Sequence, residues 1–279
     1  MSAMRSPAEV VDVSVASAET KAAGSFVKLA ILGFLAGAFM GFVGQGSTMA
    51  SFNLLADPDT YGLGRLVAGT VFPVGLILVV IAGGELFTGN TLMVTAALKR
   101  RITWARLLRN WGIVYLFNFF GALTIALLMM ASGLFDSGDA LFGAVTVKVA
   151  AGKTSLSFGA ALASGILCNW LVCLGVWMAY ATDSLAAKCL AIFFPVWLFV
   201  TSGFEHSIAN MYYLCSGFLA KARYGDEAAA IGVSEEALAG LDVAGIVGNL
   251  VPVTLGNIIG GCLFVGIAYA VAQNKLRRG

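Results

Sequence analysis

The single histidine of this 279-residue chain, His206, lies beside Glu205 where residues 201–207 interrupt a long apolar run. An ionisable side chain at the centre of a bilayer costs about 2.5–3.5 kcal/mol on insertion scales, so such residues are functional candidates by default. An imidazole can bind an anion or exchange a proton near neutral pH. The plain alternative is a buried imidazole that bridges two helices. Three features favour the functional interpretation: the interruption itself, the neighbouring Glu205, and Thr88 at a matching interruption.

Two acidic residues are each followed by an asparagine five positions later: Glu85 by Asn90, and Glu205 by Asn210. Carboxylates form strong charge-assisted hydrogen bonds, and such bonds keep them ionised. We interpret both acids, together with the two asparagines and Asn257, as supports for backbone N–H groups that helix breaks set free. In that role they hold the breaks without contacting a permeating species.

Other polar and aromatic residues near the interruptions allow two interpretations each. Lys153 is either a solvated loop lysine or a cation that draws anions into a vestibule. Asn169 either hydrogen-bonds a neighbouring helix, which we favour, or faces a pore. The aromatic residues that flank the interruptions either pack or form an apolar constriction that gates by dewetting: Phe72, Phe87 and Phe199.

Bond-making chemistry has few groups to work with in this sequence. There is one histidine, no His/Cys pattern with metal-ligand spacing and no paired nucleophile, so we expect neither an enzyme nor a bound metal ion or cofactor. The five cysteines lie in or beside apolar runs, where they act as small hydrophobic residues: Cys168, Cys173, Cys189, Cys215 and Cys262. A scaffold that merely assembles in a membrane has no need for two interruptions that carry polar residues.

The elements that position these residues must lie in a membrane. Hydrophobic residues make up 59% of the chain and charged residues 11%, against about 45–50% and about 25% in soluble domains. The scarcity of charge excludes a disordered chain. A net charge of +2 without a dense basic stripe excludes nucleic acid as a partner.

Six apolar runs are long enough to cross about 30 Å of hydrocarbon, which takes about 20 helical residues. We place them at 26–50, 65–98, 107–132, 156–180, 187–219 and 244–272. The second and fifth runs are the longest, and polar segments that contain glycine interrupt both. Non-helical backbone at membrane depth has to line a cavity or be covered by protein. We therefore predict an all-α membrane protein in which helices 2 and 5 are broken around a transport site.

Lysine and arginine set the expected orientation. The link after the second run is basic and holds no acid, and three more basic residues stand near the C-terminus, whereas the link before the sixth run is acidic. Six crossings with both ends in the cytoplasm place 12 of the 17 Lys and Arg residues inside. We expect a cytoplasmic N-terminal segment at 1–24, a six-helix channel domain at 25–273 and a cytoplasmic basic tail at 274–279.

The two halves of the chain share residue spacings. Ser25 and Ser157 each precede a glycine by eight positions, and Glu85 and Glu205 each precede an asparagine by five. A third set has steps of eight and three: Asn110, Asn118 and Gly121 against Asn249, Asn257 and Gly260. The alternative is that the two halves are unrelated, in which case the three matches occur in the same order by chance. Because each half has three crossings, the second copy enters from the opposite side, which predicts an inverted 3+3 repeat.

These residues resemble those of the formate/nitrite transporter family over about residues 28–269. The resemblance rests on three segments: Gly84–Asn90, Gly203–Asn210 and Asn249–Gly261. It implies an aquaporin-like protomer in a homopentamer, in which every protomer has its own anion pore. The Asn-Pro-Ala pairs of aquaporins are absent, which argues against a water channel.

The resemblance also implies roles for single residues. The broken second span would form an omega-shaped loop whose Thr88 faces His206 across the pore, with Lys153 as the vestibule lysine and Asn169 as the pore asparagine. Two apolar slits would flank this site: Phe72, Leu76 and Phe199 form one, and Leu86, Phe87 and Val172 form the other.

A small carboxylate anion would have to pass both slits. Moving such an ion into a low dielectric costs about 20 kcal/mol by an idealised Born estimate. Protonating a carboxylate of pKa about 3.5 at pH 7 costs only about 5 kcal/mol, at 1.36 kcal/mol per unit. We therefore expect an inner-membrane channel for small monovalent anions of weak acids, formate first, with proton-linked passage past His206. Nitrite and hydrosulfide are the alternatives; the partners would be the anion, protons and the lipid bilayer.

Overall fold

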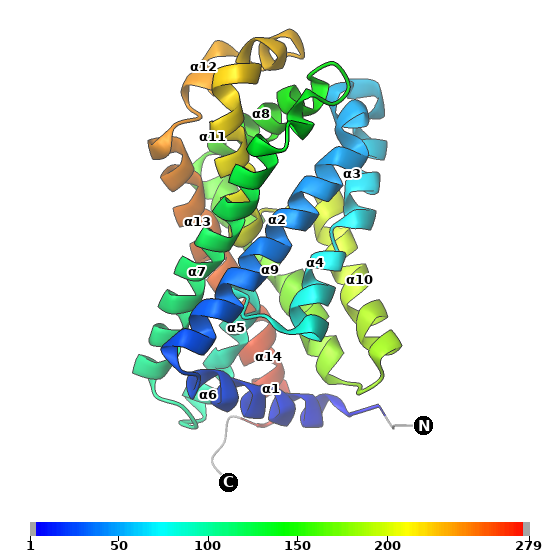
Figure 1. Cartoon of the computed structure of the whole chain (residues 1–279). Helices are drawn as coiled ribbons and strands as arrows, with labels where there is room; N and C mark the ends of the chain where they lie inside the picture. Colours follow the sequence, from blue (N-terminus) through cyan, green and yellow to red (C-terminus); the bar gives the residue numbers. More distant parts are fainter. Residues whose placement is uncertain (1–3, 276–279) are drawn as a thin grey trace.

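The computed structural model describes residues 4–275, and helices account for most of them (Figure 1). Within this range six helical stretches are long and apolar enough to cross a bilayer: Phe26–Ala56, Pro58–Gly83, Trp104–Ala131, Phe158–Tyr180, Leu185–Ser202 and Val243–Ala272. The all-helical class with six candidate spans is therefore confirmed. Most of the basic tail expected at 274–279, and residues 1–3 of the N-terminal segment, lie outside the described residues.

Polar caps define where the first helices begin. A capping box starts α1, because the Ser6 hydroxyl accepts from the Glu9 backbone N–H while the Glu9 carboxylate accepts from the Ser6 backbone N–H. Ser25 caps α2 by accepting from the backbone N–H of Lys28. The elements of this half are α1 (Pro7–Ala22), α2 (Phe26–Ala56), η1 (Pro58–Thr60), α3 (Tyr61–Val71), α4 (Val74–Ile77), the π-helix η2 (Leu78–Gly83), α5 (Phe87–Asn90), η3 (Thr91–Met93), α6 (Val94–Leu98) and α7 (Trp104–Ala131).

The second half adds a helix that the apolar pattern does not predict. This helix, α8, precedes the fourth span, and its 14 residues are too few to cross a bilayer. Ser157 then caps α9 as Ser25 caps α2. The elements of this half are η4 (Leu134–Asp136), α8 (Leu141–Thr154), α9 (Phe158–Tyr180), α10 (Leu185–Ser202), α11 (Ser207–Ala230), α12 (Glu235–Ala239), α13 (Val243–Gly261), the π-helix η5 (Cys262–Ile267) and α14 (Ala268–Ala272).

The helical ribbon stops at a glycine within each predicted interruption. Gly83 at the end of η2 has φ +96°, and Gly203 after α10 has φ +80°. A side chain would be strained in this left-handed conformation, so glycine suits the end of a helix here. After three intervening residues the helical chain resumes as α5 in the first case and as α11 in the second. The backbone between each pair of helices is left without helical partners.

Glycines let the long helices of each half lie in close contact. A Cβ atom on Gly37 of α2 would overlap the backbone of Asn118 in α7, and one on Gly121 of α7 would overlap the backbone of Phe34. Gly256 of α13 is similarly close to the backbone of α9. Small residues of this kind allow helix backbones to approach within a membrane. The helix pairs α2–α7 and α9–α13 consequently frame the site.

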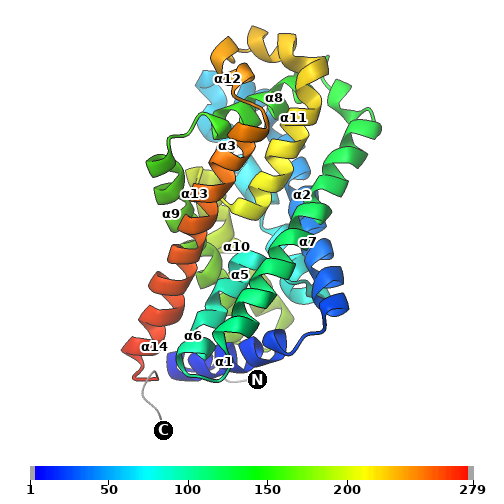
Figure 2. The ribbon, with the colours of Figure 1, turned by 90° about the vertical axis from the view of Figure 1, so that its left-hand side faces the viewer.

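The bundle has two distinct ends (Figures 1 and 2). Helix α1 lies across one end, near both ends of the described chain, and we call this end the α1 side; α12 lies at the opposite end, the α12 side. Ion pairs hold α1 in place, including Asp12 with Lys275 at 2.7 Å and Glu19 with Arg101 at 2.6 Å. The two ends of the described part, residues 4 and 275, therefore lie on the same side of the molecule, as an even number of crossings requires.

Candidate functional site

Thr88 and His206 are in direct contact although 118 positions separate them. The Thr88 hydroxyl oxygen lies 2.9 Å from Nε2 of His206, and both side chains are buried. His206 is the N-cap residue of α11. Thr88 stands on the first turn of the short helix α5 and not in the loop before it, which corrects the expected loop position. The two interrupted stretches thus meet at these two side chains.

The hydrogen bonds of the His206 ring define its tautomer. Nδ1 accepts from the backbone N–H of Ala209 at 3.0 Å, as a helix cap does. A neutral imidazole whose Nδ1 accepts carries its hydrogen on Nε2, so Nε2–H donates to the Thr88 oxygen. Among residues 4–275 the Thr88 hydroxyl has no other partner. Its own hydrogen is therefore free to bind an anion.

Asn169 of α9 fixes the backbone beside this pair. Its Nδ2 donates to the Thr88 carbonyl at 3.1 Å and to the Asn257 carbonyl at 2.6 Å. Within the part of the chain that the structure describes, its buried Oδ1 has no partner. Asn169 therefore bonds neighbouring elements, as we favoured from the sequence, and also leaves one acceptor next to Thr88.

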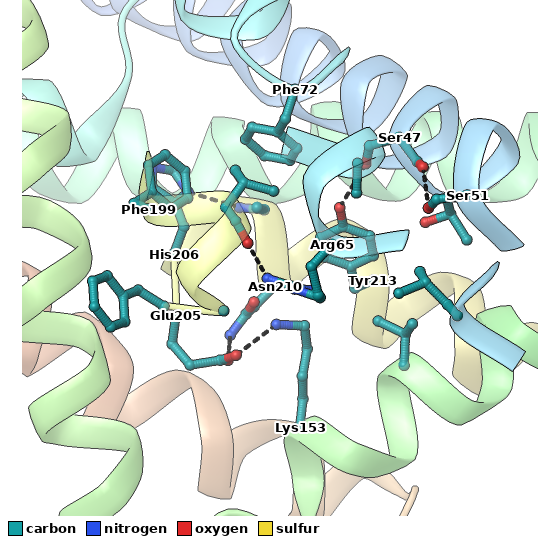
Figure 3. A pocket seen from close by; sticks show the side chains of 18 residues that line it. Ser47, Ser51, Arg65, Phe72, Lys153, Phe199, Glu205, His206, Asn210 and Tyr213 are labelled. Atoms are coloured by element: carbon teal, nitrogen blue, oxygen red, sulfur yellow. Dashed lines mark hydrogen bonds and ion pairs between the residues drawn. The ribbon is translucent and has the colours of Figure 1, made fainter. Parts of the chain in front are cut away.

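Two cavities approach the site from opposite sides. The α12-side cavity reaches His206 (Figure 3), whereas the α1-side cavity ends at Leu86 and Gly89. Each cavity has more basic than acidic residues in its wall, so both favour anions. The charged residues are Arg65, Lys153 and Glu205 in the α12-side cavity, and Lys21, Lys28, Lys188 and Glu85 in the α1-side cavity.

Phe72 and Phe199 contact each other in the wall of the α12-side cavity. Their ring centroids are 5.8 Å apart in an edge-to-face arrangement, and both rings line the α12-side cavity. Phe199 also lies nearly parallel to the His206 ring at 5.9 Å. Leu76, predicted for the same slit, lines the α1-side cavity. Two aromatic rings therefore border the α12-side cavity next to His206.

The residues predicted for the second slit have different surroundings. Leu86 lines the α1-side cavity together with Leu76. Phe87 and Val172 are buried but line neither of the two cavities. Phe87 instead packs edge-on against Tyr115, at 4.9 Å between centroids. Leu76 and Leu86 thus both border the α1-side cavity.

On the α12 side two side chains hold the Glu205 carboxylate. Lys153 Nζ lies 2.7 Å from Oε1, and Asn210 Nδ2 lies 2.5 Å from Oε2. Asn249 accepts from Asn210 and donates to the Lys153 carbonyl. Lys153 lies near the end of α8, and its side chain is only 14% exposed. It is therefore neither a solvated loop lysine nor an unpaired cation.

The α1 side repeats this arrangement with a lysine that the sequence prediction missed. Lys21 Nζ lies 3.0 Å from Oε1 of Glu85, whose Oε2 accepts from Asn90 at 2.6 Å. Asn110 accepts from Asn90 and donates to the Lys21 carbonyl. A signal was present in the sequence: Lys21 stands four residues before the serine cap of α2, as Lys153 does before the cap of α9.

The predicted role of Glu85 and Glu205 is wrong in one respect, because neither carboxylate accepts from the backbone freed at the interruptions. The first backbone N–H of α5 donates to Asn118 Oδ1 at 3.0 Å, and that of α11 donates to Asn257 Oδ1 at 2.8 Å. The carboxylates are occupied by lysines and asparagines, since a buried charge needs an opposite charge more than it needs a neutral donor. They support the interruptions only through these neighbours.

A bundle of membrane-crossing helices with a buried polar pair between two positively charged cavities defines a multi-pass membrane transport protein. A model of the formate/nitrite transporter family matches residues 8–271. The chain belongs to the formate/nitrite transporter family.

Relatives with printed functions match almost the whole chain. The formate channel FocA of Escherichia coli K12 is 39% identical over 95% of this chain and 93% of its own length. A probable formate transporter of Methanothermobacter thermautotrophicus is 38% identical over 96% and 97%. Among solved structures, an FNT family ion channel has a TM-score of 0.79 and 31% identity, covering 95% of this chain and 98% of that one. A pentameric formate channel with formate bound has a TM-score of 0.77 and 36% identity, covering 88% and 97%.

Proposed function

We propose that this chain conducts small monovalent anions of weak acids across the bilayer, with formate as the principal substrate. Relatives that share 38–39% identity are named a formate channel and a probable formate transporter, and one structural neighbour holds formate. The observation that carries the proposal is the buried contact of Thr88 with His206 beside a cavity rich in basic residues. Nitrite is the second candidate, because the matching family model covers both anions.

The apolar boundaries select the form in which the substrate crosses. Phe72 and Phe199 offer no hydrogen bonds, so an anion that passes them loses its hydration. The idealised Born cost of such a transfer is about 20 kcal/mol. Protonation of a carboxylate with a pKa of about 3.5 costs about 5 kcal/mol at pH 7. The neutral acid is consequently the species that crosses the apolar boundary.

At the site itself the anion binds and receives a proton. The excess of basic residues in each cavity gathers the anion at the mouth. At the site, the free hydroxyl hydrogen of Thr88 binds one oxygen of the anion, while Nε2–H of His206 polarises that hydroxyl. The proton reaches the anion between the two apolar boundaries through water, or from a His206 ring that has first taken up a second proton from water and then returns to its neutral form. The anion is restored when the acid reaches the opposite cavity.

Matched hydrogen bonds in the two halves support an inverted 3+3 repeat with helices 2 and 5 broken. The equivalent groups are Lys21, Glu85, Asn90 and Asn110 in the first half, and Lys153, Glu205, Asn210 and Asn249 in the second. We place the α1 side, with both chain ends and the basic link after α6, in the cytoplasm and the protein in the inner membrane. Assembly as a homopentamer is supported by the pentameric structural neighbour.

The test is flux of labelled formate into liposomes that contain the purified protein. Wild-type flux should rise as the external pH falls, by up to tenfold per unit where the neutral acid limits the rate. His206→Phe removes both ring nitrogens and should abolish this dependence. Because His206 also caps α11, His206→Asn is the second variant: asparagine can cap a helix but has no titratable ring.

Two outcomes would contradict parts of the proposal. Formate flux that ignores both external pH and His206 would remove the protonation step. A wild-type protein that carries nitrite or hydrosulfide but not formate would replace the principal substrate. Flux of acetate, measured beside the other three anions, gives the size limit of the route. Recovery of chemically unchanged substrate inside the liposomes separates a channel from an enzyme.

A further inference from the structure

Arg65 is a cation of the α12-side cavity that the proposed mechanism leaves without a specific task. It lies on α3, and Figure 3 shows its side chain reaching into the same space as Lys153. One of its guanidinium nitrogens donates to the Val200 carbonyl near the end of α10. No carboxylate pairs with Arg65 anywhere in residues 4–275.

The charge balance of the cavity makes Arg65 the group that an arriving anion meets. The ammonium of Lys153 is 2.7 Å from the Glu205 carboxylate, so these two charges largely cancel at a distance. Both side chains are nearly buried, at 14% and 7% exposed, whereas Arg65 is half-buried and faces the cavity. The unbalanced positive charge in the wall of the α12-side cavity is therefore that of Arg65.

The remaining polar groups of this wall have few hydrogens to offer. On α2, the hydroxyls of Ser47 and Thr48 both donate to the Gly44 carbonyl, and the hydroxyl of Ser51 donates to the Ser47 carbonyl. Arginine has five N–H donors, and the Val200 carbonyl uses one. The volume of the cavity open to the centres of water-sized molecules is about 70 Å³. A single buried water needs about 10–15 Å³ by this measure, so an anion has room to reach the guanidinium.

On this basis, and resting on the proposed function, we propose that Arg65 is the anion-binding and specificity residue of the α12-side mouth. A guanidinium is a planar fork that binds two coplanar oxygens through parallel hydrogen bonds. Formate, acetate and nitrite present two such oxygens, whereas hydrosulfide presents a single sulfur. Arg65 therefore binds two-oxygen anions outside the Phe72–Phe199 boundary in preference to hydrosulfide.

The alternative role for Arg65 is structural, as a cap on the carbonyls at the end of α10. Arg65→Lys separates the two roles, because lysine keeps the charge and a donor for Val200 but lacks the fork. Arg65→Gln removes the charge as well. Arg106, exposed at the start of α7 and lining neither of the two cavities, gives the matched control variants Arg106→Lys and Arg106→Gln.

Binding is measured without transport, as the concentration of formate, nitrite or hydrosulfide that half-maximally stabilises the detergent-solubilised protein against heat. Formate flux in liposomes is measured in parallel on the same variants. Arg65→Lys should raise the half-stabilising concentration of formate and nitrite about tenfold and that of hydrosulfide less than twofold. Arg65→Gln should raise the half-stabilising concentrations of all three anions, and the Arg106 variants should change none of these concentrations.

The results separate this inference from the proposed function. Wild-type anion preference in Arg65→Lys, or unchanged formate binding in Arg65→Gln, would overturn the inference and leave Arg65 as a cap. Formate binding that depends on Arg65 in a protein without formate flux would uphold the binding site and overturn the channel function. If Arg65→Gln yields little folded protein, Arg65→Lys alone decides the outcome.

Discussion

Asn118 and Asn257 make the same three hydrogen bonds in the two halves of the chain. The Oδ1 of each accepts from the first backbone N–H of the helix that follows an interruption, at 3.0 and 2.8 Å. The Nδ2 of each donates to two carbonyls: that of a glycine in the neighbouring long helix and that of Glu85 or Glu205. Each amide thus joins three backbone segments at membrane depth, where no water can replace it.

Asn257→Leu should destabilise the protein strongly. It leaves one buried N–H and two buried carbonyls without their partner, and each such group costs about 1–3 kcal/mol. We expect a melting temperature in detergent that is lower by several degrees, and a similar loss in Asn118→Leu. Asn53→Leu makes the same change at an exposed position of α2 and is the control. Equal melting temperatures for Asn53→Leu and Asn257→Leu would contradict the structural role.

Lys153→Met should cost more stability than removing both charges of its pair. Breaking a buried ion pair leaves one charge uncompensated, at about 3–5 kcal/mol, whereas replacing both partners is often close to neutral. The double variant Lys153→Met with Glu205→Gln should therefore melt at a higher temperature than Lys153→Met alone. The two single variants and the double variant form a double-mutant cycle, which is measured by thermal unfolding. Additive losses would show that the charges do not interact.

Thr88→Val should reduce formate flux at least about tenfold while leaving the fold intact. Valine has the shape of threonine but lacks the hydroxyl, and a hydrogen bond to a charged group contributes about 1.5–3 kcal/mol. Thr88→Ser keeps the hydroxyl and should retain most of the flux. Thr124→Val on α7 makes the same change where the hydroxyl bonds only its own helix. Flux in Thr88→Val that matches Thr124→Val would exclude the hydroxyl from the site.

Phe199→Ala should widen the range of anions that pass. Removing one of the two rings opens the boundary with Phe72, so the ratio of acetate to formate flux should rise. Phe194→Ala removes an exposed ring from the same helix, α10, and should leave the ratio unchanged. The measurement is uptake of both labelled acids into the same liposomes. A constant ratio in Phe199→Ala would locate the size limit elsewhere.

Acid should loosen the start of α1 from the neighbouring turn. The hydrogen bond from Arg5, at 2.5 Å, lowers the pKa of Asp183, and the backbone N–H of Ser6 lowers the pKa of Glu9. Because the pKa of each carboxyl group is lower in the folded state, its contact stabilises the fold fully above the ordinary carboxyl range, near pH 4. This stabilisation is lost as the pH falls through the folded-state pKa. Hydrogen exchange of the amides at residues 5–10 should accelerate below about pH 4. Asp183→Asn should already show faster exchange near neutral pH, and equal rates in the two proteins would count against the contact.

Membrane physics explains why so much of the fold could be predicted. A bilayer sets the length and hydropathy of each span, so all six candidates overlap the predicted runs. Polar groups at membrane depth must find partners within the protein. The inverted repeat predicted that the two interruptions would meet, and the resemblance to the family implied that Thr88 would face His206. Gly83 and Gly203 marked the places where the helical ribbon stops.

The features that escaped prediction depend on side-chain packing. Helix α8 is too short for a span, and it is held by packing against α11 and, to a lesser extent, α2. The lysine partners of the two acids come from distant segments, although the spacing before the serine caps would have identified Lys21. Arg65 is a single basic residue in an apolar run, and only the cavity shows what it faces. Phe72 and Leu76 line different cavities, which the residue pattern does not show.

Every side chain along the described route, from Arg65 through His206 to Lys21, belongs to one copy of the chain. A complex that mixes intact and inactivated copies would therefore keep the routes of its intact members. Mutations at Thr88 or His206 should then behave as recessive in a cell that carries both alleles. Uptake should decline in proportion to the fraction of defective copies, without the steep loss that a shared central route would produce.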